Sequence, residues 1–280
     1  MKSRKASVWK RGFTFAESPR WHDGAFWFSD FHAHTVYRVA GDGSLEAVVE
    51  VPGEPSGLGW LPDGRLLVVS MTDRKLMRLD PDGLKEHADL GGIATYHCND
   101  MVVDGEGRAY VGNFGAAWGD APRPAKLARV DADGSVSIAA ENLDFPNGCA
   151  ITADGRTLVV AETVGGRLTA FDRDASGGLH NRRVWAEVDG TPDGICMDAE
   201  GAVWVAAGAG GVLRVADGGE VLDRVEVTEN IPVACMLGGA DRKTLYIPTT
   251  INAGPEELAR ERKSKIETVE VDVPGSGWPA

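Results

Sequence analysis

Six copies of one short pattern run along this 280-residue chain, and they constrain its fold more than any other feature. In each copy a polar turn comes directly before an apolar strand. The turn residues are Gly24, Gly64, Gly107, Gly155, Gly201 and, in the last copy, Arg242. Successive copies lie 40, 43, 48, 46 and 41 residues apart. Glycine adopts the positive φ that tight hairpin turns require, and a repeat of this length is typical of propeller blades.

A second apolar strand follows in every copy. These second strands begin at Val36, Leu76, Leu127, Leu168, Val212 and Ile266. We therefore predict an all-β fold, a six-bladed β-propeller with four-stranded antiparallel blades, as a single domain over residues 1–280. A sandwich or an open meander is the alternative, but neither needs a repeat as regular as this one.

The two ends of the chain are expected to meet in the last blade. Residues 7–11 precede the first full blade, and we predict that they add an outer strand to the sixth one. Such a strand closes the ring and removes an exposed sheet edge. The only helix that we expect covers residues 256–265, in a loop of the sixth blade.

Charge and composition exclude several classes of partner. The net charge of −13 argues against nucleic acid, whose phosphates need a basic face, and against anionic membranes. No apolar run approaches the ~20 residues of a membrane helix, and residues 1–10 lack the apolar stretch of a secretory signal. The four cysteines show neither metal-knuckle nor redox spacing. We expect a cytoplasmic monomer or weak homodimer that acts on a small molecule.

One position of the repeat builds a candidate site. It lies eight residues before the turn residue, or seven in the shorter first copy, where the innermost strand of each blade should begin. The residues at this position are Glu17, Ser56, Asn99, Asn147, Asp193 and Ala234. Rotational repetition places equivalent positions in a ring around one axis, so these side chains can converge at the mouth of the central channel.

The residue types in this ring favour a divalent cation. Buried carboxylates and amides need partners, and two carboxylates that face each other repel. One divalent cation would relieve both problems, and oxygen ligands of this kind suit a hard cation such as Ca²⁺, Mg²⁺ or Mn²⁺. The alternative is that these residues cap strands or form turns, which Asn and Asp favour.

Four fragments of the sequence resemble the SMP-30/gluconolactonase/regucalcin family, and the resemblance covers nearly the whole chain. They are Ala16-Glu17-Ser18-Pro19-Arg20-Trp21, Asn99-Asp100 followed by a strand and Asp104, Pro146-Asn147-Gly148, and Pro192-Asp193-Gly194. The resemblance implies a lactonase whose metal is bound by Glu17, Asn147 and Asp193. It also implies that Asn99 lies beside the metal and contacts the substrate or a water molecule.

The expected reaction is hydrolysis of a lactone, either a sugar lactone or a less polar one, to the hydroxy acid. The metal would polarise the carbonyl or activate water, and Asp193 would also be the general base. Asn99, with His97, would orient the substrate or hold the developing oxyanion. Ca²⁺ is our first expectation for the metal, with Zn²⁺, Mn²⁺, Mg²⁺ and Fe²⁺ as alternatives.

His97 departs from the family pattern. Sugar-lactone members often carry arginine at this position, and a shorter, titratable side chain cannot make the same forked contacts with hydroxyls. His97 could contact the substrate, pack against neighbours, or shuttle a proton. We expect Trp118 to contact the substrate. With Trp118 and Tyr96 nearby, a less polar lactone fits this site. Residues 114–124 form a loop that is either a lid or a variable surface loop.

Other residues are given structural interpretations, and other functions stay open. We expect Glu162, Thr163 and Arg167 to make structural hydrogen bonds or ion pairs, and Cys98 to be a buried thiol rather than a nucleophile. The same metal site could hydrolyse an organophosphate or another ester, or serve a lyase or isomerase. A Ca²⁺-binding propeller without catalysis is the alternative from another class.

Overall fold

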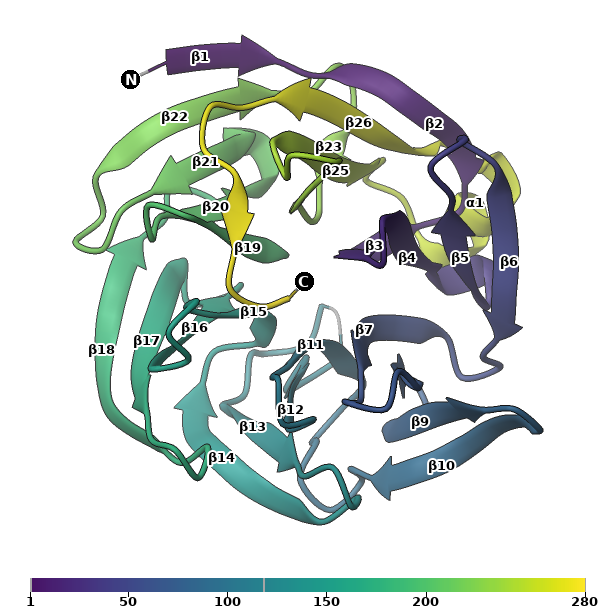
Figure 1. The fold of residues 1–280 in the computed structure, drawn as a ribbon, viewed down its shortest axis with the longest axis vertical. Helices are drawn as coiled ribbons and strands as arrows, with labels where there is room; N and C mark the ends of the chain where they lie inside the picture. Colours follow the sequence, from purple (N-terminus) through teal and green to yellow (C-terminus); the bar gives the residue numbers. More distant parts are fainter. Residues whose placement is uncertain (1, 118, 280) are drawn as a thin grey trace.

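Six β-sheets surround a central axis in the computed structural model, which describes residues 2–117 and 119–279 (Figure 1). The predicted six-bladed propeller with four-stranded antiparallel blades is confirmed. Blade one contains β3 (Ala16–His22), β4 (Ala25–Asp30), β5 (Thr35–Val39) and β6 (Leu45–Glu50). Blade two contains β7 (Pro55–Trp60), β8 (Leu66–Ser70), β9 (Lys75–Asp80) and β10 (Gly83–Asp89). Blade three contains β11 (Cys98–Val103), β12 (Ala109–Asn113), β13 (Ala125–Val130) and β14 (Val136–Leu143).

Of the last three blades, the fifth and the sixth carry additional short strands. Blade four contains β15 (Pro146–Ile151), β16 (Thr157–Glu162), β17 (Arg167–Arg173) and β18 (Leu179–Glu187). Blade five contains β19 (Ile195–Asp198), β20 (Val203–Ala206), β21 (Val212–Val215) and β22 (Val221–Glu226), with β1 (Lys2–Lys5) outside and β27 (Gly275–Ser276) inside. Blade six contains β23 (Ile231–Pro232), β24 (Met236–Gly238), β25 (Thr244–Thr250), β26 (Ser264–Glu270) and β2 (Ser7–Phe13).

The N-terminal strand closes the ring, as predicted. Strand β2 pairs antiparallel with β26, from Ser7 opposite Thr268 to Phe13 opposite Ser264. Strand β1 then continues onto the neighbouring blade, where it pairs in parallel with β22. The outer edges of blades five and six are therefore covered by one continuous N-terminal segment (Figure 1).

The turn glycines have the backbone conformation that the repeat predicts. All five have positive φ, from 70° at Gly155 to 85° at Gly64, and Arg242 takes φ 59° at the equivalent position. The predicted helix is present as α1 (Pro255–Glu261), but its predicted end at residue 265 is wrong. Arg262 adopts the left-handed conformation that ends a helix, and Ser264 already pairs in β26.

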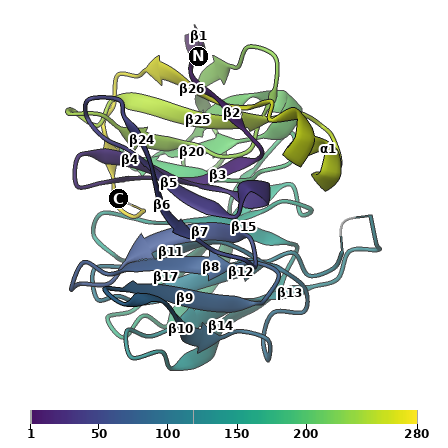
Figure 2. The same cartoon turned by 90° about the vertical axis from the view of Figure 1, so that its right-hand side faces the viewer.

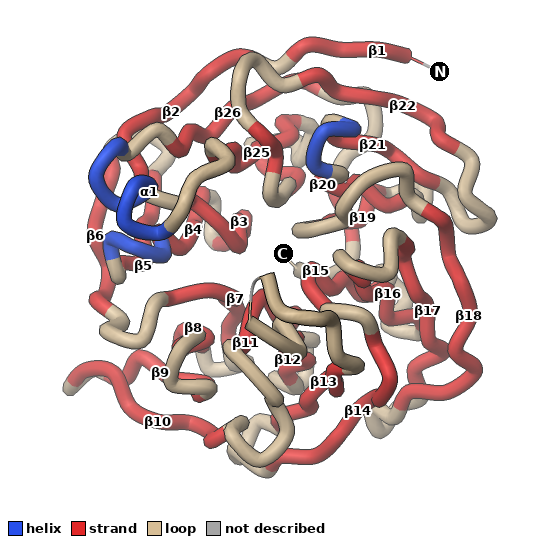
Figure 3. The backbone as a smooth tube through the Cα atoms, turned by 180° about the vertical axis from the view of Figure 1, so that it is seen from behind, coloured by secondary structure: helices blue, strands red, loops and turns tan. Residues whose placement is uncertain are grey.

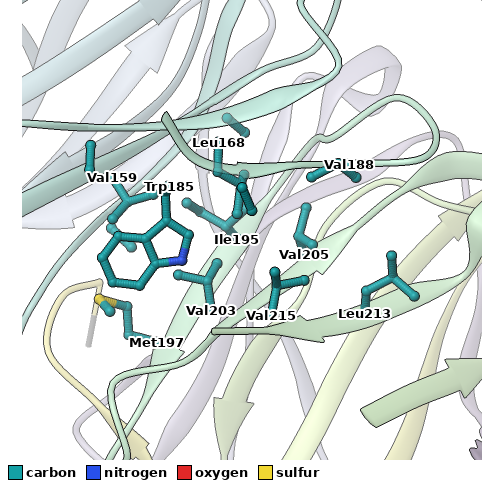
Figure 4. Packing of buried hydrophobic residues seen from close by; sticks show 14 of the residues in the cluster. Val159, Leu168, Trp185, Val188, Ile195, Met197, Val203, Val205, Leu213 and Val215 are labelled. Carbon is teal, nitrogen blue, oxygen red and sulfur yellow. The ribbon is translucent and has the colours of Figure 1, made fainter. Parts of the chain in front are cut away.

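Apolar side chains fill the space between neighbouring blades. In the cluster of Figure 4, Val159 and Leu168 of blade four pack against Ile195, Val203 and Val205 of blade five. Trp185 of β18 lies in the same cluster and is 5% exposed. These interfaces hold the blades at fixed angles, and this in turn fixes where the inner strands begin.

The two faces of the ring differ. Helix α1 lies on one face and the C-terminus on the other, as Figure 2 shows from the side. The short helical segments η1 (Phe31–Ala33) and η2 (Gly208–Gly210) accompany α1 on the face seen in Figure 3. No helix of the described residues is long and apolar enough to cross a membrane.

The C-terminal segment lies across the channel mouth on the face opposite to α1. Strand β27 pairs with β19, and Trp278 bridges to Ile151 of β15. Trp278 also borders a pocket of about 270 Å³ whose lining includes His22 and Trp60, at the ends of the inner strands. Access to the starts of the inner strands is therefore from the opposite face, the one that carries α1.

Candidate functional site

The inner strands form a closed ring, and the predicted site residues stand where these strands begin. Each inner strand contacts the next around the ring, and β24 contacts β3. Glu17, Asn99 and Asn147 are the second residues of β3, β11 and β15, and Asp193 lies two residues before β19. Glu17, Asn99 and Asn147 are buried, and Asp193 is partly exposed. The structure thus brings the four predicted side chains to one mouth of the channel.

Glycines next to the site residues allow this close approach. A Cβ atom at Gly148 would lie 2.6 Å from the carbonyl oxygen of Asp193, and one at Gly194 would lie 2.4 Å from the Cβ of Ala234. Both distances are far shorter than van der Waals contact, so a side chain at either position would push neighbouring inner strands apart. The glycines of Pro-Asn-Gly and Pro-Asp-Gly therefore keep Asn147 and Asp193 close together.

The surroundings of Glu17 and Asp193 disfavour the ionised form of both carboxyl groups. Burial, followed by the negative charges of Asp193 and Asp100, raises the pKa of Glu17 well above its ordinary value. Burial and the charge of Asp100 raise the pKa of Asp193 to about 8, although a hydrogen bond from Asn147 opposes this. Both carboxyl groups therefore lack sufficient positive charge around them, as expected for ligands of a cation.

Arg20 and Asp100 form a buried ion pair on the inner strands, a feature not predicted from the sequence. Arg20 is 2% exposed and donates to Asp100 Oδ1 at 2.5 Å. Its other hydrogen bonds go to the carbonyl oxygens of Met101, Leu58 and Pro19, at 2.6, 2.8 and 2.8 Å. The available signal was a basic and an acidic residue within inner strands that are otherwise mostly apolar.

The charges of this cluster fit a divalent cation. Glu17, Asp100 and Asp193, when ionised, carry three negative charges, and Arg20 supplies one positive charge. Two negative charges remain, which one divalent cation would neutralise. Oδ1 of Asp100 accepts from both Arg20 and the amide of Met101, so this oxygen is already paired within the protein. The set Glu17, Asn147 and Asp193 offers oxygen atoms only, which suits a hard cation.

Residues 2–117 and 119–279 contain no cluster of three or more His, Cys, Asp or Glu side chains that could hold a metal ion. The predicted ligand set does not require such a cluster, because one of its three members is an amide. The chemistry of the donors, and not a preformed cage of carboxylates, makes this site suitable for a metal.

The two asparagines make different hydrogen bonds. Asn147 donates from Nδ2 to Thr163 Oγ1 at 3.0 Å, and Thr163 Oγ1 donates to the carbonyl oxygen of Pro192 at 2.8 Å. Asn99 instead accepts at Oδ1 a hydrogen bond of 3.3 Å from Ser56. Asn147 thus keeps its oxygen free for the channel, whereas Asn99 keeps its N–H groups. The first arrangement suits a metal ligand and the second suits a donor to substrate oxygen.

Aromatic side chains line one side of the site. The ring of His97 stacks on Tyr96 at a centroid distance of 4.0 Å and lies 6.1 Å from the ring of Phe114. Phe114 in turn lies 4.6 Å from Phe145, two residues before Asn147. Burial lowers the pKa of His97, although the nearby charge of Glu54 opposes this shift. The lowered pKa favours the neutral ring near pH 7. Trp118, the third predicted substrate contact, lies outside the described residues.

A pocket of about 360 Å³ adjoins this aromatic row. Its lining includes Phe114, Phe145, Pro122, Arg123 and Val164. It lies beside the described part of the loop of residues 114–124, between β12 and β13, which projects from the same face as α1 (Figure 2). The pocket shares Phe114 and Phe145 with the aromatic row, and its lining comes from blades three and four.

Two other interpretations from the sequence can be compared with the geometry. Burial raises the pKa of the Cys98 thiol to about 12, which agrees with a buried, inert thiol. Glu162 binds Arg167 and Thr169 and accepts from the amide of Asp144, a structural role as expected. Thr163 also makes structural hydrogen bonds as expected, and one of them comes from Asn147.

The fold and the site define the class of this protein as a six-bladed propeller in which carboxylate and amide groups converge at one mouth of the channel. The chain belongs to the SMP-30/gluconolactonase/LRE-like family, whose model matches residues 15–251. This confirms the resemblance that the four sequence fragments indicated.

Curated relatives match most of the chain at moderate identity. A 6-deoxy-6-sulfogluconolactonase from Pseudomonas putida is 29% identical over 282 residues, covering 94% of this chain and 93% of that protein. A pentonolactonase from Haloferax volcanii is 28% identical, covering 94% and 92%. Regucalcin from Danio rerio is 33% identical over 170 residues, 58% of each chain.

Solved structures show the same fold. A gluconolactonase from Xanthomonas campestris is 26% identical, with a TM-score of 0.74 over 96% of this chain and 88% of that one. Regucalcin from Agrobacterium tumefaciens, described as a calcium-binding protein, has a TM-score of 0.82 at 21% identity, covering 99% and 98%. At that identity the second likeness concerns the fold alone.

Proposed function

We propose that the protein is a metal-dependent hydrolase that opens a lactone to the corresponding hydroxy acid. The observation that carries the proposal is the charged cluster at the channel mouth, in which ionised Glu17, Asp100 and Asp193 exceed Arg20 by two negative charges. The relatives that match nearly the full chain are lactonases, which supports a lactonase-type enzyme acting on a carboxylic ester. Glu17, Asn147 and Asp193 would hold the metal, with Ca²⁺ as the first candidate.

A bound divalent cation would supply a Lewis acid that polarises the lactone carbonyl and acidifies water. Asp193 takes a proton from the attacking water molecule as the water oxygen bonds to the carbonyl carbon. Asn99 donates its free N–H to the carbonyl oxygen, which becomes negatively charged. The ring C–O bond then breaks, the leaving oxygen takes the proton held by Asp193, and the hydroxy acid is released.

The substrate that fits best is a lactone with fewer hydroxyl groups than an aldonolactone. His97 offers one flat, neutral ring where a forked guanidinium would bind several hydroxyls. The row of Tyr96, His97, Phe114 and Phe145, with the adjoining pocket, favours contact with an apolar substituent. A His97→Arg variant should shift the preference toward polyhydroxylated lactones, while Gly92→Arg, which adds the same charge in open space, should not.

The test is a hydrolysis assay over aldonolactones and less polar lactones, with metal-stripped protein resupplied with single cations. Turnover should require the metal and should fall by at least 10³-fold in Asp193→Ala, on the order of removing a general base together with a ligand. Asp189→Ala removes an exposed carboxylate four residues away and should keep full activity.

Metal binding without turnover of any lactone would contradict the lactonase proposal and favour the alternatives. Organophosphates and other esters would then be tested at the same site, followed by lyase and isomerase substrates. Binding of Ca²⁺ with no catalysis at all would favour a non-catalytic propeller. The cytoplasmic location and the monomeric or weakly dimeric state stay predictions.

A further inference from the structure

We propose that Thr163 is a positioning residue that sets which end of the Asn147 amide faces the channel. The inference rests on the proposed metal site and adds to it a residue that does not itself bind the metal. Thr163 follows β16 in blade four and is 7% exposed, and its own amide donates to the carbonyl oxygen of Phe145. Both its main chain and its side chain are therefore fixed.

The hydrogen-bond chemistry of Thr163 leaves one arrangement. The carbonyl oxygen of Pro192 can only accept, so the hydroxyl of Thr163 must donate its single proton there, at 2.8 Å. The Thr163 oxygen can then only accept from Asn147, at 3.0 Å, and the atom that Asn147 presents must be its NH₂ group. The amide orientation follows from the partners and is not a free choice.

The Asp193 carboxyl group favours the same orientation. The Asn147 amide lowers the pKa of that group in opposition to its burial, as an NH₂ group turned toward the carboxyl would. With its NH₂ group facing Thr163 and Asp193, Asn147 leaves its carbonyl oxygen, Oδ1, for the channel. An amide oxygen binds a hard cation, whereas an amide NH₂ group repels it.

Thr163 also connects two ligands that belong to different blades. Asn147 is the second residue of the inner strand of blade four, and Pro192 directly precedes Asp193 of blade five. One hydroxyl therefore holds the amide of the first ligand against the backbone of the second. Residues that orient metal ligands in this way typically change metal affinity by about 10- to 100-fold when they are removed.

The test compares Thr163→Val with Thr163→Ser by titrating CaCl₂ or MnCl₂ alone into metal-free protein in a calorimeter. Valine keeps the shape but neither donates nor accepts, so we expect its dissociation constant to rise at least tenfold. Serine keeps the hydroxyl and should stay within about threefold of the wild type. Thermal melts of the metal-free proteins measure any general loss of stability.

Thr35→Val is the matched control. Thr35 is also 7% exposed and donates to a carbonyl oxygen at 2.8 Å, that of Ala33, but it lies in β5 away from the site. It should lose stability comparable to that of Thr163→Val without a change in metal affinity.

Three results would overturn the inference while leaving the proposed function intact: Thr163→Val binds the cation as tightly as the wild type, Thr163→Ser binds as weakly as Thr163→Val, or Thr35→Val weakens binding equally. A wild-type protein that binds neither cation would overturn both this inference and the metal-dependent function. The wild-type titration therefore separates the two failures.

Discussion

Ser18 is a strained residue directly beside a proposed ligand. It has φ 48°, a left-handed conformation that glycine adopts freely and other residues adopt at a cost of about 1–2 kcal/mol. Its side chain is fully buried, and its hydroxyl has no hydrogen-bond partner among the described residues. The conformation is held by the Ser18 amide, which donates to a carboxyl oxygen of Glu17. The strain is therefore coupled to the orientation of Glu17.

We expect Ser18→Gly to stabilise the protein by about 1 kcal/mol. The variant removes the left-handed strain and the unpaired hydroxyl, which together exceed the entropy cost of glycine in the unfolded chain. The amide that binds Glu17 is kept, so metal binding should not change. Chemical denaturation with metal-free protein measures the difference.

Asp23→Gly provides the comparison for this change. Asp23 has the same φ of 48°, but its side chain is exposed and Asp tolerates this conformation well. Its stability should therefore change by less than that of Ser18→Gly. A Ser18→Gly variant that is less stable than the wild type would contradict the interpretation of Ser18 as strained.

At the scale of elements, the segment between β14 and β15 is fixed by one buried carboxylate. Glu162, fully buried at the end of β16, accepts from the amide of Asp144 at 2.6 Å and from Thr169. It also pairs with Arg167 at 2.9 Å and Arg182 at 3.0 Å. These bonds hold the segment that leads into Asn147.

Glu162→Gln should destabilise the protein by about 3 kcal/mol at pH 7, since one buried acceptor of several charged hydrogen bonds becomes a donor. Burial alone would raise the pKa of Glu162, but the bonds from Thr169, the Asp144 amide and Arg167 outweigh it and lower the pKa. Stability from this carboxylate is then fully present above its unfolded pKa of about 4.3 and is lost as the pH falls through the lower folded pKa.

Urea titrations at several pH values check this prediction. The difference between wild type and Glu162→Gln should be constant above about pH 5 and shrink below pH 4. Glu106→Gln is the control, because Glu106 pairs with Arg108 at the surface, where its side chain is 67% exposed, and should change stability by less than about 0.5 kcal/mol. An undiminished difference at pH 3 would contradict the role given to the ionised carboxylate.

At the scale of the whole molecule, the sequence predicts the structural features that recur in every copy of the repeat. The turn positions, the inner-strand starts and the convergence of Glu17 and Asp193 follow from the spacing that every copy of the repeat shares. The ion pair of Arg20 with Asp100, and the contact of Thr163 with Pro192, were not predicted. They depend on the distances between inner strands of different blades, which are set by side-chain packing and not by the spacing of the repeat.

The position of the C-terminal segment could not be predicted from the repeat either. Strand β27 and Trp278 follow the last copy of the repeat, so no periodic signal marks their place across the far channel mouth. The end of α1 was also mispredicted, because a charged, helix-favouring composition continues to residue 265 while pairing with β2 begins the strand at Ser264. In both cases a contact distant in sequence decides the local structure.

Closure by the N-terminal strand should dominate the stability of the ring. Deleting residues 2–13 removes β2, exposes the edge of β26 and uncovers the pocket of Phe13, which packs against Phe28 at 4.8 Å. Deleting residues 2–5 removes only β1, which pairs along the outside of β22 and leaves β2 in place. The longer deletion should lower the melting temperature by more than about 10 °C and promote aggregation through the open edge, whereas the shorter one should cost only a few degrees. Thermal melts with light scattering measure both quantities. Equal melting temperatures for the two deletions would mean that β2 does not close the ring and that blade packing alone holds the inner strands together at the site.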